Sequence, residues 1–194
     1  MKHCSVLGAG TMGNGIAHVF ATSGWNVSLF DISAPALERA LATISKNLER
    51  QVAKGLLSAE DAAAAVARIS THTELAPAVA GSALVVEAAT ENVDIKLKLF
   101  AQLDEVCAPE TILASNTSVI RIAELAQSLN RPERFCGLHF CYPAKSRRLV
   151  EVIGGPQTSE STLASVCQWV RAIGKVPLVV RDSPGFVINR LLCP

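Results

Sequence analysis

The sequence predicts an α/β fold built on a doubly wound, mostly parallel β-sheet, and three observations predict it. Apolar segments of strand length alternate with helical segments along the whole chain, an order typical of parallel sheets covered by helices. The first strand runs directly into a glycine-rich turn and a helix. The segment 83–89 is almost continuously apolar, as expected for a strand that is buried on both faces.

The glycine-rich turn is the most specific short motif of the chain. After a strand at 2–7, it reads Gly8-Ala9-Gly10-Thr11-Met12-Gly13. Gly8 makes the tight turn, Gly10 has no side chain to hold a pyrophosphate off the backbone, and Gly13 lets the helix lie close to the sheet. The helix N-terminus then points unpaired N–H groups at the phosphates. This context predicts a dinucleotide site formed by the residues from Gly8 to Gly13, in a Rossmann-type fold.

The second strand indicates which dinucleotide is bound. Residues 25–30 form this strand, and Asp31 stands at its end. An acidic residue about 20 positions beyond the glycines binds the ribose hydroxyls of the adenosine. Because its carboxylate would repel a 2′-phosphate, we predict that the cofactor is NAD rather than NADP.

The first half of the chain carries clear signals for the starts and ends of helices. Ser33 and Ser58 are placed as N-caps, and Gly55 breaks the helix between them. The expected elements, in order, are the strand at 25–30, a helix at 33–54, a helix from 58, a short strand at 68–71, the apolar strand at 83–89 and a helix at 93–107.

The second half predicts an antiparallel extension of the sheet. The strands at 135–140 and 149–153 are joined by a connection too short for a crossover helix, so we expect them to pair antiparallel. The expected elements are a strand at 111–115, a helix at 120–129, these two strands, a helix at 159–173, a strand at 175–180 and the beginning of a helix at Phe186.

Composition excludes several classes of function. The chain has 194 residues, 49% of them hydrophobic and 18% charged, with a net charge of +1; this argues against disorder, a nucleic-acid surface and a basic membrane patch. We expect no membrane span and no signal peptide. The six cysteines include no C-x-x-C pair, so we predict reduced thiols, a cytoplasmic protein and no metal site.

Four polar features of the sequence are expected at the edge of the sheet where ligands bind in open α/β folds. They are the segment 115–118, His139, Glu151 and Asn189. Glu151 stands among four aliphatic residues and needs a partner, because an unpaired buried charge is costly. Antiparallel pairing would bring it opposite His139, giving an imidazole that a carboxylate orients and makes more basic, as a general base requires.

Simpler structural interpretations of the same residues stay open at this point. The segment 115–118 is also consistent with a turn that caps the following helix, and its spacing alone favours that role. A single histidine such as His139 is more often a satisfied core residue than a base. Asn189 is also consistent with a backbone cap. We expect purely structural roles for His3, His18 and His72, at a strand end, in a helix and in a turn.

Six motifs, in order and at the family's spacing, resemble the L-3-hydroxyacyl-CoA dehydrogenase family, which includes 3-hydroxybutyryl-CoA dehydrogenases. The resemblance covers the whole chain and implies the NAD-dependent oxidation of an L-3-hydroxyacyl-CoA to a 3-oxoacyl-CoA, in fatty-acid oxidation or short-chain acyl-CoA metabolism. The motifs lie at 6–13, 86–88, 114–118, 137–140, 149–153 and 184–190.

The resemblance also implies roles for individual residues. His139 would be the base and Glu151 its orienting partner. Ser118 and Asn189 would bind the 3-oxygen of the substrate or hold the reacting groups in place. Lys54 loosely matches a lysine that contacts CoA phosphates, although a solvated helix end is an equally good interpretation.

Two further residues match family positions on the cofactor side of the site. Glu91 and Lys96 are implied to lie near the nicotinamide and its ribose, and Ser118 belongs to this side as well. Tyr142 replaces an asparagine that contacts the cofactor side in the family, a departure that bears on how the nicotinamide is positioned. The charged segment 145–148 replaces a largely apolar stretch; Arg147 or Arg148 would bind CoA phosphates or an acidic acyl group, or belong to a solvated loop.

The resemblance also implies a domain organisation. We expect residues 1–185 to form the NAD-binding domain and residues 186–194 to begin a helical C-terminal domain that is otherwise absent from this chain. In the family that domain supplies a homodimer interface and closes over the acyl chain, so we expect little activity from the 194 residues alone. Two alternatives remain: a gulonate- or carnitine-type dehydrogenase of the same superfamily, and an NAD-binding module without turnover.

Overall fold

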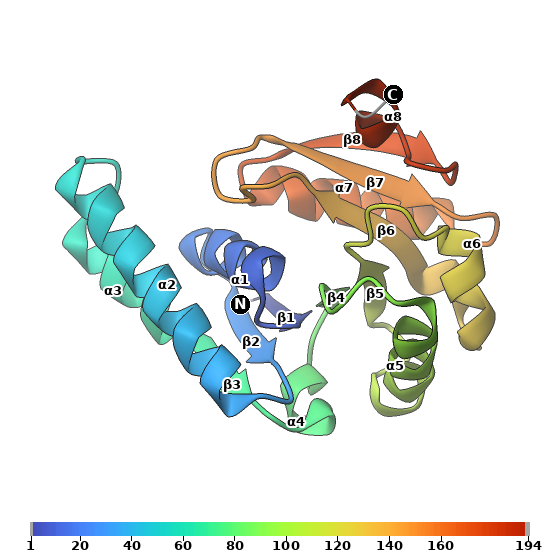
Figure 1. The fold of residues 1–194 in the computed structure, drawn as a ribbon, viewed down its shortest axis with the longest axis horizontal. Helices are drawn as coiled ribbons and strands as arrows, with labels where there is room; N and C mark the ends of the chain where they lie inside the picture. Colours follow the sequence, from blue (N-terminus) through green and yellow to red (C-terminus); the bar gives the residue numbers. More distant parts are fainter. Residues whose placement is uncertain (1, 193–194) are drawn as a thin grey trace.

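An eight-stranded sheet organises the computed structural model, which describes residues 2–192 (Figure 1). Its strand order is β3-β2-β1-β4-β5-β6-β7-β8. Strands β1 to β6 are parallel, β6 and β7 pair antiparallel, and β7 and β8 are parallel to each other. The strands are β1 His3–Leu7, β2 Asn26–Phe30, β3 Ile69–His72, β4 Leu84–Glu87, β5 Ile112–Ser115, β6 Phe135–Phe140, β7 Leu149–Gly154 and β8 Val176–Arg181.

Helices cover both faces of this sheet. Residues of α1, α2, α3 and α7 form one buried apolar cluster with the sheet, and residues of α4, α5 and α6 form a second cluster. Figure 1 shows α1 to α3 and α5 to α6 on opposite sides of the sheet. The helices are α1 Thr11–Thr22, α2 Ala34–Ala53, α3 Ala59–Ala67, α4 Leu75–Val79, α5 Val93–Val106, α6 Ile122–Leu125, α7 Glu160–Ala172 and α8 Ile188–Leu192.

The burial of the strands confirms the predicted class of fold. Along β1, Val6 packs into the first cluster and its neighbour Leu7 into the second, because successive side chains point to opposite faces. All four residues of β4 are buried. The structure is therefore a doubly wound, mostly parallel sheet, and its antiparallel extension is the predicted pairing of β6 with β7.

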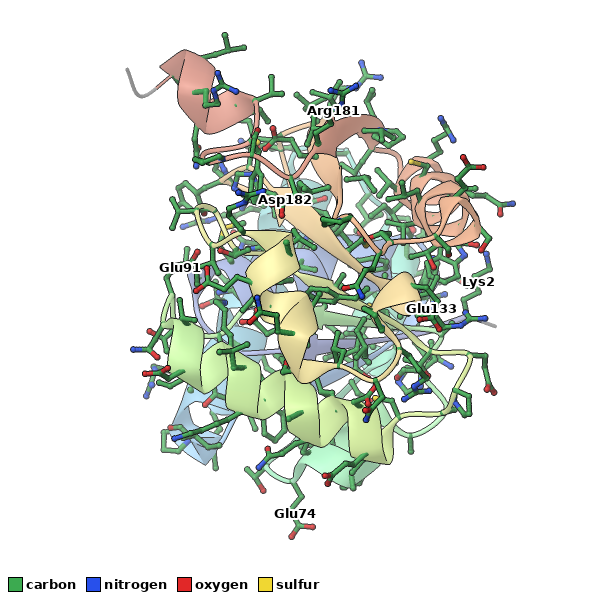
Figure 2. All side chains as sticks on the ribbon, turned by 90° about the vertical axis from the view of Figure 1, so that its right-hand side faces the viewer. Lys2, Glu74, Glu91, Glu133, Arg181 and Asp182 are labelled. Atoms are coloured by element: carbon green, nitrogen blue, oxygen red, sulfur yellow. The ribbon has the colours of Figure 1, made fainter. Side chains whose placement is uncertain are left out.

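The predicted helix at 120–129 is the main difference from expectation. It consists of the short helix α6 followed by a 3₁₀ turn at Ala126–Ser128. The carboxylate of Asp182 accepts hydrogen bonds from the backbone N–H groups of Ile122 and Ala123 and fixes the start of α6 there (Figure 2). Since this cap comes from a residue about 60 positions away, the local pattern contains no sign of it.

Three smaller differences concern short segments. The helix α4 and a 3₁₀ turn at Pro132–Arg134 were not predicted. His72 is the last residue of β3 rather than part of a turn.

Within residues 2–192, no helix combines the length and apolar character needed to cross a bilayer, and no group of three or more His, Cys, Asp or Glu residues is arranged to hold a metal. Five cysteines are free thiols, and Cys193 lies outside the described residues.

Candidate functional site

The glycine turn brings β1 and α1 closer together than any side chain would allow. Gly8 has a φ of +104°, and a Cβ on it would lie 2.6 Å from the carbonyl oxygen of Ala88. A Cβ on Gly13 would lie 1.7 Å from the carbonyl oxygen of Gly8. No atom lies within 4 Å of the corresponding position on Gly10. The turn is therefore tightly packed at Gly8 and Gly13 and open at Gly10, which fits a backbone that a pyrophosphate approaches closely.

A mostly apolar cavity of about 570 Å³ lies beside this turn. Phe30 and Ile32 line it, together with Gly8 and Gly10. Asp31 also lines the cavity, and its carboxylate accepts hydrogen bonds from the backbone N–H groups of Ala9 at 2.8 Å and Ser33 at 2.9 Å. These bonds fix the carboxylate at the end of β2, where the ribose of a dinucleotide is bound in this fold.

Thr11 and Met12, the two residues between Gly10 and Gly13, differ in exposure. Thr11 is exposed at the start of α1 and lines a smaller cavity of about 180 Å³ with Gly10. Met12 is partly buried against the first core cluster. Both stand in the first turn of α1, and their expected contacts with the cofactor stay predictions.

A buried ion pair fixes the ends of β4 and β5, and its carboxylate was not predicted. Glu87 is fully buried and accepts hydrogen bonds from Lys96 Nζ at 2.5 Å, from Ser115 Oγ at 2.6 Å and from the N–H of Ala89 at 2.8 Å. Lys96 is itself only 1% exposed and also lies 3.5 Å from Glu91. A carboxylate within an apolar run of the sequence was the available signal, the same one that identified Glu151.

Glu91 connects the start of α5 to the loop after β5. Its Oε1 accepts hydrogen bonds from the hydroxyl of Thr117 and from the N–H of Ser118, the latter at 3.0 Å. Figure 2 shows Glu91 beside the first turn of α5, and Lys2 on the opposite side of the molecule. The carbonyl oxygen of Ser118 accepts a hydrogen bond from Asn189 Nδ2 at 2.9 Å. The predicted residues Glu91, Ser118 and Asn189 therefore form one connected group.

His139 and Glu151 form a second group, as predicted. They are register partners on β6 and β7, and His139 Nδ1 lies 2.7 Å from Glu151 Oε2. Glu151 is fully buried and His139 is 6% exposed. The other oxygen, Oε1, accepts hydrogen bonds from the N–H groups of Val187 and Ile188, each at 2.9 Å. The segment 187–189 therefore contacts both groups of predicted site residues.

These contacts determine the charge of Glu151. Burial by itself raises the pKa of Glu151, but the hydrogen bonds from His139, Ile188 and Val187 outweigh it and hold this pKa below its ordinary value. Glu151 is therefore an ionised acceptor at neutral pH. An ionised partner keeps the proton of a neutral His139 on Nδ1, and Nε2 is then the nitrogen that can take up another proton.

Lys54 lies apart from these groups, at a basic cavity of about 600 Å³ between α1, α2 and the loop after β6. Lys54 is exposed, and Arg50, Lys145 and Lys175 also line the cavity. His18 lines it too and is only 3% exposed. Among the residues that the structure describes, its Nδ1 is the one buried side-chain N or O atom without a hydrogen-bond partner.

Lys175 fixes the loop between β6 and β7. Its Nζ donates hydrogen bonds to the carbonyl oxygens of Ala144, Lys145 and Arg147, at 2.6, 3.2 and 2.7 Å. Burial lowers the pKa of Lys175. Tyr142 on the same loop is 66% exposed, and the side chains of 145–148 are also exposed.

The sheet, the open glycine turn and the acidic residue at the end of β2 define an NAD-binding domain of the Rossmann type. The chain matches the family described as "3-hydroxyacyl-CoA dehydrogenase, NAD binding domain" over residues 3–183. It belongs to that family, and its cofactor is NAD.

Two curated proteins with similar sequences are named as dehydrogenases of hydroxyacyl-CoA compounds. The chain is 43% identical to the 3-hydroxyadipyl-CoA dehydrogenase of Escherichia coli K12 over 98% of its length, and 43% identical to a 3-hydroxybutyryl-CoA dehydrogenase of Bradyrhizobium diazoefficiens over 100%. It spans 40% and 66% of those two relatives. The crystal structure of the (S)-3-hydroxybutyryl-CoA dehydrogenase of Ralstonia eutropha superimposes on it with a TM-score of 0.96 at 44% identity, covering 100% of this chain and 68% of that one.

Proposed function

We propose that the protein carrying this domain oxidises an L-3-hydroxyacyl-CoA to the 3-oxoacyl-CoA, with NAD as cofactor. The observation that carries this proposal is the buried pair of His139 and Glu151, with 2.7 Å between Nδ1 and Oε2. A neutral imidazole hydrogen-bonded to a carboxylate has the arrangement of a general base. The names of the relatives support the class of substrate.

In the proposed reaction His139 takes the proton of the substrate hydroxyl on Nε2. Glu151 holds the imidazole in the tautomer that leaves Nε2 free, and stabilises the imidazolium that forms. In the reverse direction the imidazolium returns the proton to the 3-oxygen. Ser118 and Asn189, which the structure links directly, hold that oxygen in place. NAD, when bound, supplies the hydride acceptor.

We assign the cofactor contacts to the residues around the glycine turn and the ends of β2 and β4. The backbone from Gly8 to Gly13 would face the pyrophosphate and Asp31 the adenosine ribose. Glu91, Lys96 and Ser118 would lie on the nicotinamide side. Because Lys96 is buried between two carboxylates, its charge would act on the cofactor side by holding Glu91 in place.

The basic cavity fits the phosphates of CoA. Lys54 and Arg50 stand on its α2 side and Lys145 on its loop side, so a bound anion would meet positive charge from both. The neutral His18 has an unpaired Nδ1 in the same wall. This would be the binding site of the part of the thioester farthest from the reacting carbon.

The exposed charges of 145–148 favour one variation of this proposal. Arg147 and Arg148 would also suit an acyl group, or another hydroxy acid, that ends in a carboxylate. Comparing acetoacetyl-CoA with a 3-oxoacyl-CoA whose chain ends in a carboxylate would distinguish the two. Equal kcat/KM for both substrates would leave the arginines without a role in selection.

We also propose how the domain is used. Residues 1–185 would form the NAD-binding domain, and 186–194 would begin a helical domain that closes over the acyl chain and forms a homodimer. The 194 residues alone would then fold and bind NADH but turn over acyl-CoA poorly. Full activity from this chain as a monomer would contradict this view.

The experiment is a steady-state assay with acetoacetyl-CoA and NADH on the full-length protein carrying this domain. His139→Gln should lower turnover by roughly two to four decades, the range for loss of a general base, while NADH binding by calorimetry is unchanged. Glu151→Gln should have a smaller effect and shift the basic limb of the pH profile. Near-normal turnover in His139→Gln would show that another group takes the proton.

A further inference from the structure

Phe186 has an unusual backbone for its residue type. Its φ is +50°, and among residues 2–192 it is the one residue other than glycine with a positive φ. It directly follows Gly185, with a φ of +71°. Residues with a Cβ rarely adopt this left-handed conformation, and it persists only where the surroundings enforce it. Such outliers gather at functional sites, so the question is what enforces this one.

The aromatic ring anchors Phe186. It is fully buried in the second core cluster. The ring centroid lies 6.0 Å from that of the His139 imidazole, with 52° between the planes. The N–H of Phe186 donates to the carbonyl oxygen of Ser183 at 2.9 Å and closes the turn. Burial of the ring offsets the cost of the left-handed backbone and places the ring beside the candidate base.

The backbone that follows explains what this turn achieves. The next two N–H groups, of Val187 and Ile188, both point at one oxygen of Glu151. With that oxygen held by two donors, the carboxylate has a fixed rotation, and its second oxygen stays directed at His139 Nδ1. The same three residues therefore contact the base with a ring and its carboxylate partner with two N–H groups.

We propose that Phe186 is a positioning residue for His139, acting through Glu151: its buried ring holds a left-handed turn that aims two N–H groups at the carboxylate and so fixes the tautomer of the imidazole. This rests on the proposed role of the pair as a general base. Without the anchor, the turn relaxes to an ordinary conformation and the two N–H groups leave Oε1. The carboxylate then rotates, and the Nδ1–H tautomer loses its advantage.

The test measures the tautomer directly, in the 194-residue chain, by NMR of ¹⁵N-labelled imidazole nitrogens. The signals of His139 are assigned from their absence in His139→Gln. In the unaltered chain we expect the Nδ1–H form to dominate. In Phe186→Ala we expect the population of the Nε2–H form to rise about tenfold, the effect of losing one hydrogen bond to a charged group.

Phe100→Ala is the matched control. Phe100 is also fully buried, belongs to the same core cluster, and packs on Phe135 with 4.8 Å between ring centroids. This variant loses an equal ring and should keep the tautomer of the unaltered chain. If Phe186→Ala leaves the His139 signals unchanged, or if both variants change them equally, the proposal is wrong.

Phe186→Leu covers the case in which Phe186→Ala does not fold, because it keeps a large apolar side chain in the core. It should show a smaller shift in the same direction, and a folded Phe186→Leu with unchanged signals would also refute the proposal. The readout requires no turnover, so it is independent of the assay on His139→Gln. Failure of the proposed function would appear in that assay while the tautomer result stands.

Discussion

Replacing Gly13 with alanine tests how much of the fold depends on the close approach of α1 to β1. The new Cβ would lie 1.7 Å from the carbonyl oxygen of Gly8, half of the 3.4 Å at which ordinary contact begins. Both atoms are fixed to backbone, so no side chain can rotate away and the first turn of α1 must move. Overpacking of this kind costs about 3 kcal/mol, and the better helix propensity of alanine returns about 1 kcal/mol.

The net expectation for Gly13→Ala is a loss of about 2 kcal/mol in the free energy of unfolding, or about 4–8 °C in Tm for a domain of this size. Urea unfolding followed by circular dichroism measures it. NADH binding should weaken as well, because the displaced turn no longer presents its N–H groups to the pyrophosphate.

Gly10→Ala is the control that separates packing from binding. Gly10 is the N-cap of α1, and beyond its chain neighbours nothing lies within 4 Å of an added Cβ. Stability should therefore change by less than about 1 kcal/mol, the scale of an N-cap substitution. The methyl group would occupy space that we assign to the pyrophosphate, and NADH affinity should fall by about tenfold or more. An unchanged unfolding midpoint in Gly13→Ala, or unchanged NADH affinity in Gly10→Ala, would refute this account of the turn.

Two further predictions concern Asp31 and His18. The unaltered chain should bind NADH at least about tenfold, or 1.4 kcal/mol, more tightly than NADPH. Asp31→Ala should reduce this difference in affinity. Equal affinities for NADH and NADPH in calorimetry would contradict the role of Asp31 at the adenosine ribose. Burial, with smaller effects from Lys145 and Lys175, lowers the pKa of His18 from 6.5 to about 4. At a pH between these two pKa values the unfolded chain binds more protons than the folded chain, so the stability falls as the pH is lowered. In urea titrations at pH 7 and pH 5, His18→Gln should lose less stability than the unaltered chain, and an equal loss in both would show that other groups cause it.

The sequence predicted those parts of the fold that have local signals. The first glycine turn, the capped helices α2 and α3 and the buried strand β4 all carry their own patterns, and the structure confirms them. The prediction of a single helix over 120–129 was wrong. The start of α6 is fixed by the carboxylate of Asp182, which directly follows β8 and is distant in sequence. The helix α4 has five residues including Pro77, too few for a periodic pattern to show.

The candidate site, too, could be predicted only where the sequence pattern shows which residues meet. His139 and Glu151 could be paired in advance because the antiparallel register of two strands determines which residues face each other. Glu87 and Lys96 could not, because β4 and α5 meet through a turn whose direction the sequence does not reveal. The left-handed backbone of Phe186 was equally hidden, since glycine is the residue by which such turns are recognised.

The way Lys175 holds the loop between β6 and β7 has a consequence for how this domain can diversify. Its ammonium contacts three carbonyl oxygens, and carbonyl oxygens are present whatever residues occupy the loop. The course of residues 144–147 therefore depends in part on one distant lysine, besides the buried side chain of Ala144 and the hydrogen bonds that the exposed side chains of the loop make. Substitutions there can change the charge at the mouth of the basic cavity at little cost to the fold. This loop is thus a place where new substrate preferences can arise while the sheet, the glycine turn and the His139–Glu151 pair stay the same.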